Sequence, residues 1–291
     1  MKKIRFLLVG PGNVGISLAA AWVRAGHVCV DVEGGRPVAR AQTRSLLGIR
    51  ARRGGSDLGR PGFDLLLIAV PDRCISQVAR SWAGRVPWTG KTVLHTSGVI
   101  GASALSPLRR QGASVGSLHP LRSLPRPMPG RDTFREIFFG IQGDRQAARV
   151  AGRLAREIGG KTIQVRRDLQ ALYHLGACLS SGYLLGLIDA AATRIGVSAA
   201  NPRRFREALL ALAETTLRTA REKGLERSLT GPIVRGDLIA IRAHLTAMES
   251  LPLELRELHR TLALHTLNLA AGSRRTPPAL ADRTRRLFKK K

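Results

Sequence analysis

Three glycines follow the first apolar run of the chain at the spacing of a phosphate-binding turn. The segment LLVGPGNVG places Gly10, Gly12 and Gly15 in a G-x-G-x-x-G pattern between an expected strand and an expected helix. Gly10 permits the tight turn, Gly12 lets a pyrophosphate approach the backbone, and Gly15 lets the helix pack on the strand. This setting favours a dinucleotide site over a purely structural turn. The predicted cofactor contacts are Gly10, Pro11, Gly12, Asn13, Val14 and Gly15.

The end of the next apolar run bears on which dinucleotide binds. In VCVDVEGGRP, Glu33 is placed to bind the ribose hydroxyls of NAD, and Arg36 to meet the 2′-phosphate of NADP. Two glycines between them leave room for that phosphate. The basic balance of the chain also favours the extra phosphate. We therefore expect NADP or NAD as cofactor, with NADP weakly preferred.

Two further runs end in residues that can line the same ligand. LLLIAVPD ends with Val70 and Pro71, and VLHTSG contains Ser97. Ligands of parallel sheets bind beyond the carboxyl ends of the strands, so all three residues are expected near the cofactor. Ordinary turn and capping chemistry remains the alternative for Ser97.

Histidine is the natural proton donor for the alkoxide or amine that forms when a hydride is transferred. His119 follows the apolar run VGSL, and His174 lies in a long helical segment with Ser181 two turns further along. These three residues are the predicted catalytic candidates, with His174 as the first choice for the proton donor. A hydrogen-bonded core histidine is the alternative for each ring. No set of His and Cys residues has metal-ligand spacing.

The stretch LTGPIVRGD, residues 229–237, interrupts the helical half with two glycine turns. Asp237 is expected to cap the helix that follows. Thr230 and Arg235 would then lie beside a helix N-terminus, where anions bind, and an arginine fork suits a carboxylate or phosphate. We expect Thr230, Arg235 and Asp237 to bind substrate, with a plain interhelical turn as the alternative.

The periodicity of apolar residues divides the chain into an alternating half and a helical half. Short apolar runs alternate with amphipathic segments up to about residue 165, which predicts a parallel sheet covered on both faces. Strands are expected at 4–9, 28–32, 65–70, 92–96, 115–118, 138–142 and 162–165. Helices are expected at 14–24, 75–82, 102–110, 145–158, 169–195, 202–223, 238–248 and 252–271. The predicted fold is α/β, a Rossmann-like doubly wound parallel sheet over residues 1–166 followed by an all-α domain over 167–291.

The net charge of +28 raises nucleic acid as a partner. The arginines are spread along the chain, and aromatic residues make up 4% and do not interleave with the basic residues, so a solvated basic surface is favoured instead. The tail RTRRLFKKK is the one candidate for a basic arm, with a frayed terminus as its alternative. The longest uninterrupted apolar runs are too short to cross a bilayer, and we expect a cytoplasmic protein with no membrane partner.

Five segments together resemble a known family. VGPGNVG, VLHTSG, GSLHPLRSLP, ALYHLGACLSSGYLLGLIDAA and LTGPIVRGD are similar, in order and spacing, to bacterial oxidoreductases with a Rossmann-like NAD(P)-binding domain and an uncharacterised helical domain. These are relatives of the superfamily of pyrroline-5-carboxylate reductase, ketopantoate reductase and 6-phosphogluconate dehydrogenase. The resemblance covers nearly the whole chain except the basic tail.

The resemblance implies a dinucleotide-dependent oxidoreductase that forms a homodimer, and it leaves the substrate open. Together with the residues above, we expect hydride transfer between NAD(P) and a small anionic carbonyl or imine compound at a cleft between the domains. It also implies a polar residue facing the nicotinamide on the first long helix of the second domain, where this chain has Tyr173-His174, then Ser180, Ser181 and Gly182, and no lysine. Members of the family often carry asparagine at the position of Gly182. That departure supports the alternative of a dinucleotide-binding sensor or scaffold without catalysis.

Overall fold

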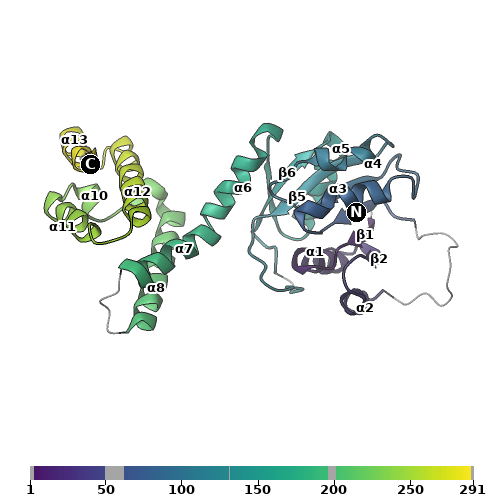
Figure 1. Ribbon diagram of the computed structural model, residues 1–291. Helices are drawn as coiled ribbons and strands as arrows, with labels where there is room; N and C mark the ends of the chain where they lie inside the picture. The colour runs from purple at the N-terminus through teal and green to yellow at the C-terminus, as the bar shows by residue number, and fades with distance from the viewer. Residues whose placement is uncertain (1–2, 50–61, 131, 196–200, 290–291) are drawn as a thin grey trace. The chain divides into compact units, whose positions relative to one another are not determined.

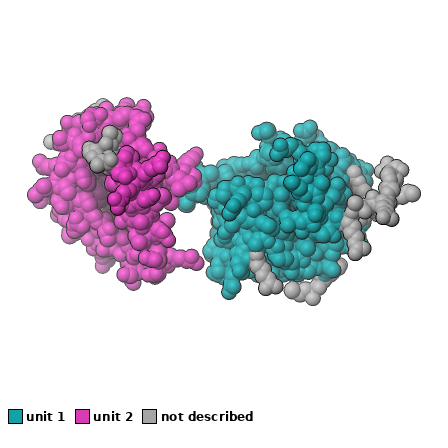
Figure 2. Space-filling model, turned by 90° about the horizontal axis from the view of Figure 1, so that it is seen from below, with its two compact units in different colours: residues 1–181 teal, residues 182–291 magenta. Residues whose placement is uncertain are grey.

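The chain folds into two compact units. The computed structural model describes residues 3–49, 62–130, 132–195 and 201–289. The first unit comprises Met1–Ser181 and the second comprises Gly182–Lys291 (Figure 2). The first unit therefore includes a helix beyond residue 166, and the assignment of cofactor binding to residues 1–166 and of substrate binding and dimerisation to 167–291 stays a prediction.

A seven-stranded sheet forms the centre of the described part of the first unit (Figure 1). The strands are β1 (Arg5–Val9), β2 (Val28–Glu33), β3 (Leu65–Ile68), β4 (Thr92–His95), β5 (Ser114–Pro120), β6 (Phe138–Gly143) and β7 (Lys161–Gln164). They confirm the seven predicted strands. Their order is β2-β1-β3-β4-β5-β6-β7, so the chain leaves β1 in one direction and returns to β3 on its other side. The carboxyl ends of β1 and β3 thus form the switch point at which such sheets bind ligands.

The sheet departs from a wholly parallel arrangement at one pair. β6 runs antiparallel to β5, with His119 opposite Gly140, while β7 is parallel to β6. A parallel return would need a crossover helix, and antiparallel neighbours need none. Residues 121–137 instead form turns and irregular backbone in the described part of that connection, and they contain Pro125, Pro127 and Pro129.

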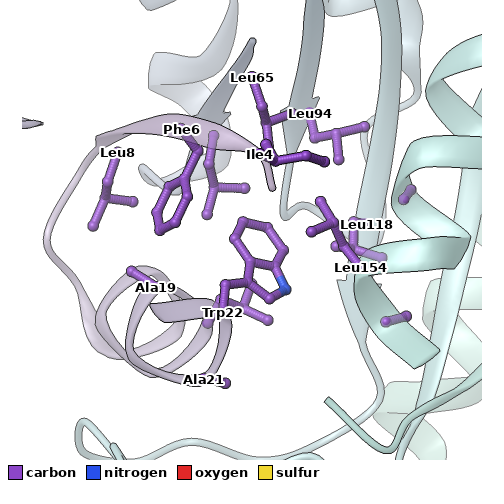
Figure 3. Close-up of a cluster of buried hydrophobic side chains, with 14 of the residues drawn as sticks. Ile4, Phe6, Leu8, Ala19, Ala21, Trp22, Leu65, Leu94, Leu118 and Leu154 are labelled. Atoms are coloured by element: carbon purple, nitrogen blue, oxygen red, sulfur yellow. The ribbon is translucent and has the colours of Figure 1, made fainter. Parts of the chain in front are cut away.

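Helices cover both faces of the sheet. On one face α1 (Asn13–Arg24) and α5 (Arg145–Glu157) pack on a cluster that includes Phe6, Leu8, Leu94 and Leu118 (Figure 3). The Trp22 ring of α1 packs edge to face against the Phe6 ring, with 5.3 Å between the ring centroids. On the other face α3 (Asp72–Trp82), the 3₁₀ turn η1 (Ala102–Leu105) and α4 (Ser106–Arg109) pack on a second cluster. The predicted doubly wound sheet is confirmed, because buried strands with apolar residues on both faces require two layers of helices.

The long helix predicted at 169–195 is interrupted. After the 3₁₀ turn η2 (Arg167–Leu169), α6 (Gln170–Leu179) ends before Ser180, and α7 (Gly182–Ala190) follows and runs into the π-helical turn η3 (Ala191–Ile195). The hydroxyl of Ser180 donates to Gly176 O and that of Ser181 to Ala177 O. Serine hydroxyls that bond to backbone carbonyls compete with helix continuation, and Gly182 weakens the helix further. The division between the two units falls at this break.

Helices make up the described part of the second unit. After α7 and η3 they are α8 (Pro202–Lys223), α9 (Leu225–Ser228), α10 (Pro232–Arg235), α11 (Leu238–Met248), α12 (Leu253–Gly272) and α13 (Pro278–Lys289). Its small core contains Ile241, Ala263 and Phe288. The helices predicted at 202–223, 238–248 and 252–271 are confirmed.

Apart from the four-residue helices α9 and α10, two helices were missed by the sequence patterns. α2 (Pro37–Leu46) has few apolar residues, so its periodicity is weak, although Pro37 occupies the first helical position that proline favours. The basic C-terminal segment is helical up to Lys289, as part of α13, so a frayed terminus is wrong for its described residues. Phe288 is buried, and Arg260 donates to its backbone carbonyl at 2.9 Å. This aromatic anchor holds the segment on the second unit.

Candidate functional site

The phosphate turn, residues 10–15, has the backbone that its glycines predict. Gly10 has a φ of 95°, and a Cβ there would lie 2.5 Å from Ala69 O. A Cβ at Gly15 would lie 2.5 Å from Gly10 O, so no larger residue lets α1 pack this closely on the strands. Both positions require glycine for the fold itself.

Gly12 differs, because the space beside it is open. The nearest atom to a Cβ at Gly12 would be Ala69 O at 3.9 Å, and its φ of −90° suits any residue. Gly12 is the N-cap of α1 and has no side chain to bind the first amides, and the first turn carries no acidic residue. The amides at this helix start are therefore available to an anion.

The turn after β2 packs against the phosphate turn. A Cβ on Gly35 would meet Pro11 Cγ at 3.0 Å, and Gly10 N donates to Glu33 O at 2.9 Å. The carboxylate of Glu33 lies 3.6 Å from the Arg85 guanidinium. Arg36 is exposed and is the N-cap residue of α2. Glu33 and Arg36, which are predicted to bind the ribose hydroxyls or the 2′-phosphate, thus lie on a turn that contacts the phosphate turn.

The remaining predicted cofactor residues lie at the carboxyl ends of β3 and β4. Val70 packs against Gly10, because a Cβ on Gly10 would lie 2.7 Å from Val70 Cγ1. Pro71 is the N-cap residue of α3. Ser97 is buried, and its hydroxyl oxygen accepts hydrogen bonds from the amides of Val99 and Ile100. Its side chain therefore holds the loop after β4, which is the capping role that the sequence left open.

Two of the predicted catalytic residues meet on the first unit. His119 near the end of β5 and His174 of α6 have ring centroids 5.8 Å apart. The Tyr173 hydroxyl lies 2.9 Å from His119 Nδ1. We call His119, Tyr173 and His174 the ring cluster. Parallel strands β1, β3, β4 and β5 end at the same edge of the sheet, so the ring cluster and the phosphate turn share the edge at which dinucleotides bind.

Two glycines make room for the ring cluster. A Cβ on Gly98, just after β4, would lie 2.6 Å from His174 Cδ2 and 2.7 Å from His119 Cε1. A Cβ on Gly140 of β6 would lie 2.1 Å from the Tyr173 hydroxyl. Any larger residue at either position would push the rings apart.

Helix α6 turns its polar side toward the sheet. Its less exposed residues are Gln170, Tyr173, His174, Ala177 and Cys178, at the spacing of one helix face. The amide of buried Gln170 donates to Gly98 O at 2.7 Å. Leucines instead occupy the exposed side. The sequence analysis did not propose Gln170 or Cys178 as site residues, and it named Tyr173 beside His174 without giving it a role. The available signal was this row of polar residues in an apolar helix.

Burial is the largest effect on the pKa values of His119 and Tyr173. It lowers the pKa of His119 to about 4, with a further lowering from His174 and an opposing effect of Asp72. It raises the pKa of Tyr173 to about 12, which a backbone hydrogen bond from Gly140 partly offsets. Both groups are therefore neutral at pH 7. His95, in β4, is also buried, and its pKa falls to about 4 for the same reason.

Ser181 is not brought to the ring cluster. It is exposed, beyond the end of α6, and its hydroxyl donates to Ala177 O at 2.7 Å. The prediction that it shares a helix face with His174 assumed a continuous helix, which the break before α7 removes.

The residues predicted to bind substrate on the second unit surround α10 and α11. Asp237 caps α11 as predicted, since its carboxylate accepts from Ala240 N at 3.1 Å. Arg235 and Thr230 are exposed, one at the end of α10 and the other just before it. The carboxylate of Asp237 already occupies this helix start. An anion at Arg235 would therefore depend on the guanidinium rather than on free amides.

Comparisons with known families match both halves of the chain. Residues 2–120 match the Rossmann-like domain, and residues 137–266 match a domain of unknown function, DUF2520. No curated protein matches the sequence significantly.

Solved structures share the fold at low identity. Protein TM1727 from Thermotoga maritima is 19% identical with a TM-score of 0.72, over 92% of this chain and 99% of that chain. A pyrroline-5-carboxylate reductase from Coxiella burnetii is 14% identical with a TM-score of 0.62, over the full length of both chains. A Plasmodium falciparum pyrroline carboxylate reductase with NADP bound is 11% identical with a TM-score of 0.55, over 99% and 100%. The chain thus combines a Rossmann-like domain with the domain of unknown function DUF2520.

Proposed function

We propose that the protein is an NAD(P)-dependent oxidoreductase that transfers a hydride between the nicotinamide and a small anionic carbonyl or imine compound. The observation that carries the proposal is the placement of a phosphate turn and a cluster of three polar rings at one edge of the sheet. Relatives of the same fold that are named reductases, one of them with NADP bound, support it. The dinucleotide supplies the hydride, and the protein binds it, orients the substrate and stabilises the charge that develops.

Within this proposal each group of residues has a defined task. The phosphate turn binds the pyrophosphate through the amides of α1, and the turn after β2 binds the adenosine ribose. The ring cluster contributes the polar groups nearest the nicotinamide, with His119 and His174 as the catalytic candidates. Arg235 remains the candidate for the anionic group of the substrate, which is a prediction about the second unit.

We propose NADP as the preferred cofactor because of the turn after β2. Arg36 is exposed at the start of α2, where the first turn has no acidic residue, and two glycines with positive φ precede it. A 2′-phosphate would receive both the guanidinium and the helix start. Glu33 is paired with Arg85, which reduces its negative field at this position.

Arg36→Ala is expected to raise the Kd for NADPH about tenfold to a hundredfold and to change the Kd for NADH by less than about twofold. Fluorescence titration of both reduced dinucleotides measures the two constants. Arg149→Ala, which removes an exposed arginine from α5, is the matched control for loss of charge. An equal change for both dinucleotides would contradict a 2′-phosphate contact.

Turnover decides between an enzyme and the alternative of a dinucleotide-binding sensor. NADPH and NADH are titrated first, and a panel of small keto acids, aldehydes and cyclic imines that carry a carboxylate is then assayed by oxidation of the bound dinucleotide. Binding together with turnover supports the proposal. Tight binding without turnover on any member of the panel would favour the sensor, and absence of binding would contradict both.

We also propose that a second copy of the chain covers the exposed side of α6. Leu172, Leu175 and Leu179 of this helix are 63%, 44% and 56% exposed. An 18-residue window within Arg167–Arg194 has a mean hydropathy of 1.4, as a membrane span would, and only 6% of that window is buried. The polar side of α6 is bonded to the first unit through Tyr173 and Gln170, which leaves the three leucines as an exposed apolar stripe. A stripe of this kind is self-complementary in a two-fold dimer.

Leu175→Glu is expected to convert the dimer to a monomer, because it places a charge in the centre of the apolar stripe. The mass measured by light scattering during gel filtration would fall from twice the chain mass of 31.5 kDa to the mass of one chain. Leu46→Glu, at an exposed position of α2, is the control and should leave the mass unchanged. A wild-type protein that is monomeric, or that needs detergent to stay in solution, would contradict the proposal.

A further inference from the structure

The hydrogen bond between Tyr173 and His119 can run in either direction. The hydroxyl oxygen and Nδ1 lie 2.9 Å apart, and a distance does not show which atom carries the proton. If the hydroxyl donates, Nδ1 is bare and the neutral ring carries its proton on Nε2. If Nδ1 donates, Nε2 is bare and can only accept. The two cases give His119 opposite roles toward a bound substrate.

The surroundings of the tyrosine oxygen decide the direction. The hydroxyl lies against the backbone of Gly140, where a Cβ would come within 2.1 Å of it, and it carries a single hydrogen. That hydrogen needs an acceptor, since an unsatisfied polar group in a half-buried site is costly. Of the two atoms, the imidazole nitrogen is the stronger base and the phenol the stronger acid, which favours donation by the hydroxyl. In the part of the chain that the structure describes, His119 Nδ1 is the acceptor at hydrogen-bond distance.

We infer that Tyr173 donates to His119 Nδ1 and thereby holds His119 as the neutral tautomer with its proton on Nε2. Tyr173 is thus a positioning residue, and this role rests on the proposed function. Nε2 makes no hydrogen bond within the described residues, so its N–H is available to the oxygen or nitrogen of a carbonyl or imine that gains negative charge as the hydride arrives. The substrate class that fits is one with a hydrogen-bond acceptor at the reacting carbon.

Titratable groups on three elements act on the charge of the His119 ring, and two of the three oppose a positive charge. His174 from α6 and His95 from β4 disfavour a positive charge on His119, and Asp72 at the start of α3 favours one. Burial is the largest effect, and it acts in the same direction as the two histidines. Donation by Tyr173 adds to it, because a bare Nδ1 exists only in the neutral ring.

The test is the protonation pattern of His119 in the full-length protein. Long-range proton-nitrogen correlation spectra of protein with ¹⁵N-labelled histidine distinguish a bare from a protonated ring nitrogen, and His119→Gln identifies the His119 signals. We expect a bare Nδ1 and a protonated Nε2 at pH 7 in the wild type. In Tyr173→Phe we expect a mixture of both tautomers and titration of His119 at higher pH. Tyr183→Phe changes the other tyrosine of the chain, which is exposed, and should change neither property.

Gly140→Ala is a second variant that keeps the tyrosine. Its Cβ would lie 2.1 Å from the hydroxyl, so the hydroxyl must move from Nδ1 and the same mixture is expected. A protonated Nδ1 in the wild type, or an unchanged tautomer in both variants, would overturn the inference. Failure to bind NADPH or NADH would overturn the proposed function and leave the tautomer result standing, so the two outcomes are distinguishable.

Discussion

Gly12→Ala is expected to weaken binding of NADPH and NADH about tenfold to a hundredfold and to leave the melting temperature unchanged. The new methyl group fits the free protein, because its nearest neighbour would be Ala69 O at 3.9 Å and the backbone at Gly12 suits any residue. It would, however, occupy the space through which the pyrophosphate reaches the amides of α1. Binding is therefore lost without loss of stability.

Gly15→Ala is the matched comparison, because the same methyl group meets the fold itself. Its Cβ would lie 2.5 Å from Gly10 O and 2.9 Å from Ala69 Cβ. We expect a loss of about 1–3 kcal/mol in the free energy of unfolding, as is typical of overpacking. Urea denaturation and dinucleotide titration of both variants separate the two effects. Unchanged dinucleotide binding by Gly12→Ala would exclude the phosphate turn as the pyrophosphate site.

The fold was largely predictable because its signals are local. Each of the seven strands is a short apolar run, and the three glycines of the phosphate turn lie between a strand and a helix as the pattern requires. The direction of β6 was not predictable, since it depends on whether the connection crosses the sheet. α2 and α13 were missed because both helices are mostly polar and bury few side chains, so they lack a clear apolar periodicity. In α13, Phe288 is one of the few buried side chains.

The candidate site was predictable only in part. His119 and His174 could be proposed from their positions after a strand and on a long helix. Their partner Tyr173 is defined by the packing of α6 on β5 and β6, which in turn depends on the small size of Gly98 and Gly140. Contacts between segments so distant in sequence leave no periodic signal in either segment.

His119→Ala is expected to lower the turnover number about a hundredfold to a thousandfold, as removal of one donor to a developing negative charge does elsewhere. The Kd for NADPH should change little, because the phosphate turn and the turn after β2 are untouched. His119→Gln retains an amide N–H at the position of Nε2 and should restore part of the turnover. His174→Ala is the comparison. A larger loss there than in His119→Ala would return the role of proton donor to His174.

The dependence of turnover on pH separates a neutral donor from a charged one. The pKa of His119 is lowered to about 4, so the neutral ring dominates above that value and turnover should stay constant between about pH 5 and pH 8. Below about pH 5, protonation removes the bare Nδ1 that accepts from Tyr173 and adds a charge beside His174 and His95, so turnover should fall. If a protonated imidazole were the donor, turnover would instead decline as the pH rises through its pKa. A decline of that kind, abolished by His119→Gln, would show that His119 acts as an imidazolium and that Tyr173 does not hold it neutral.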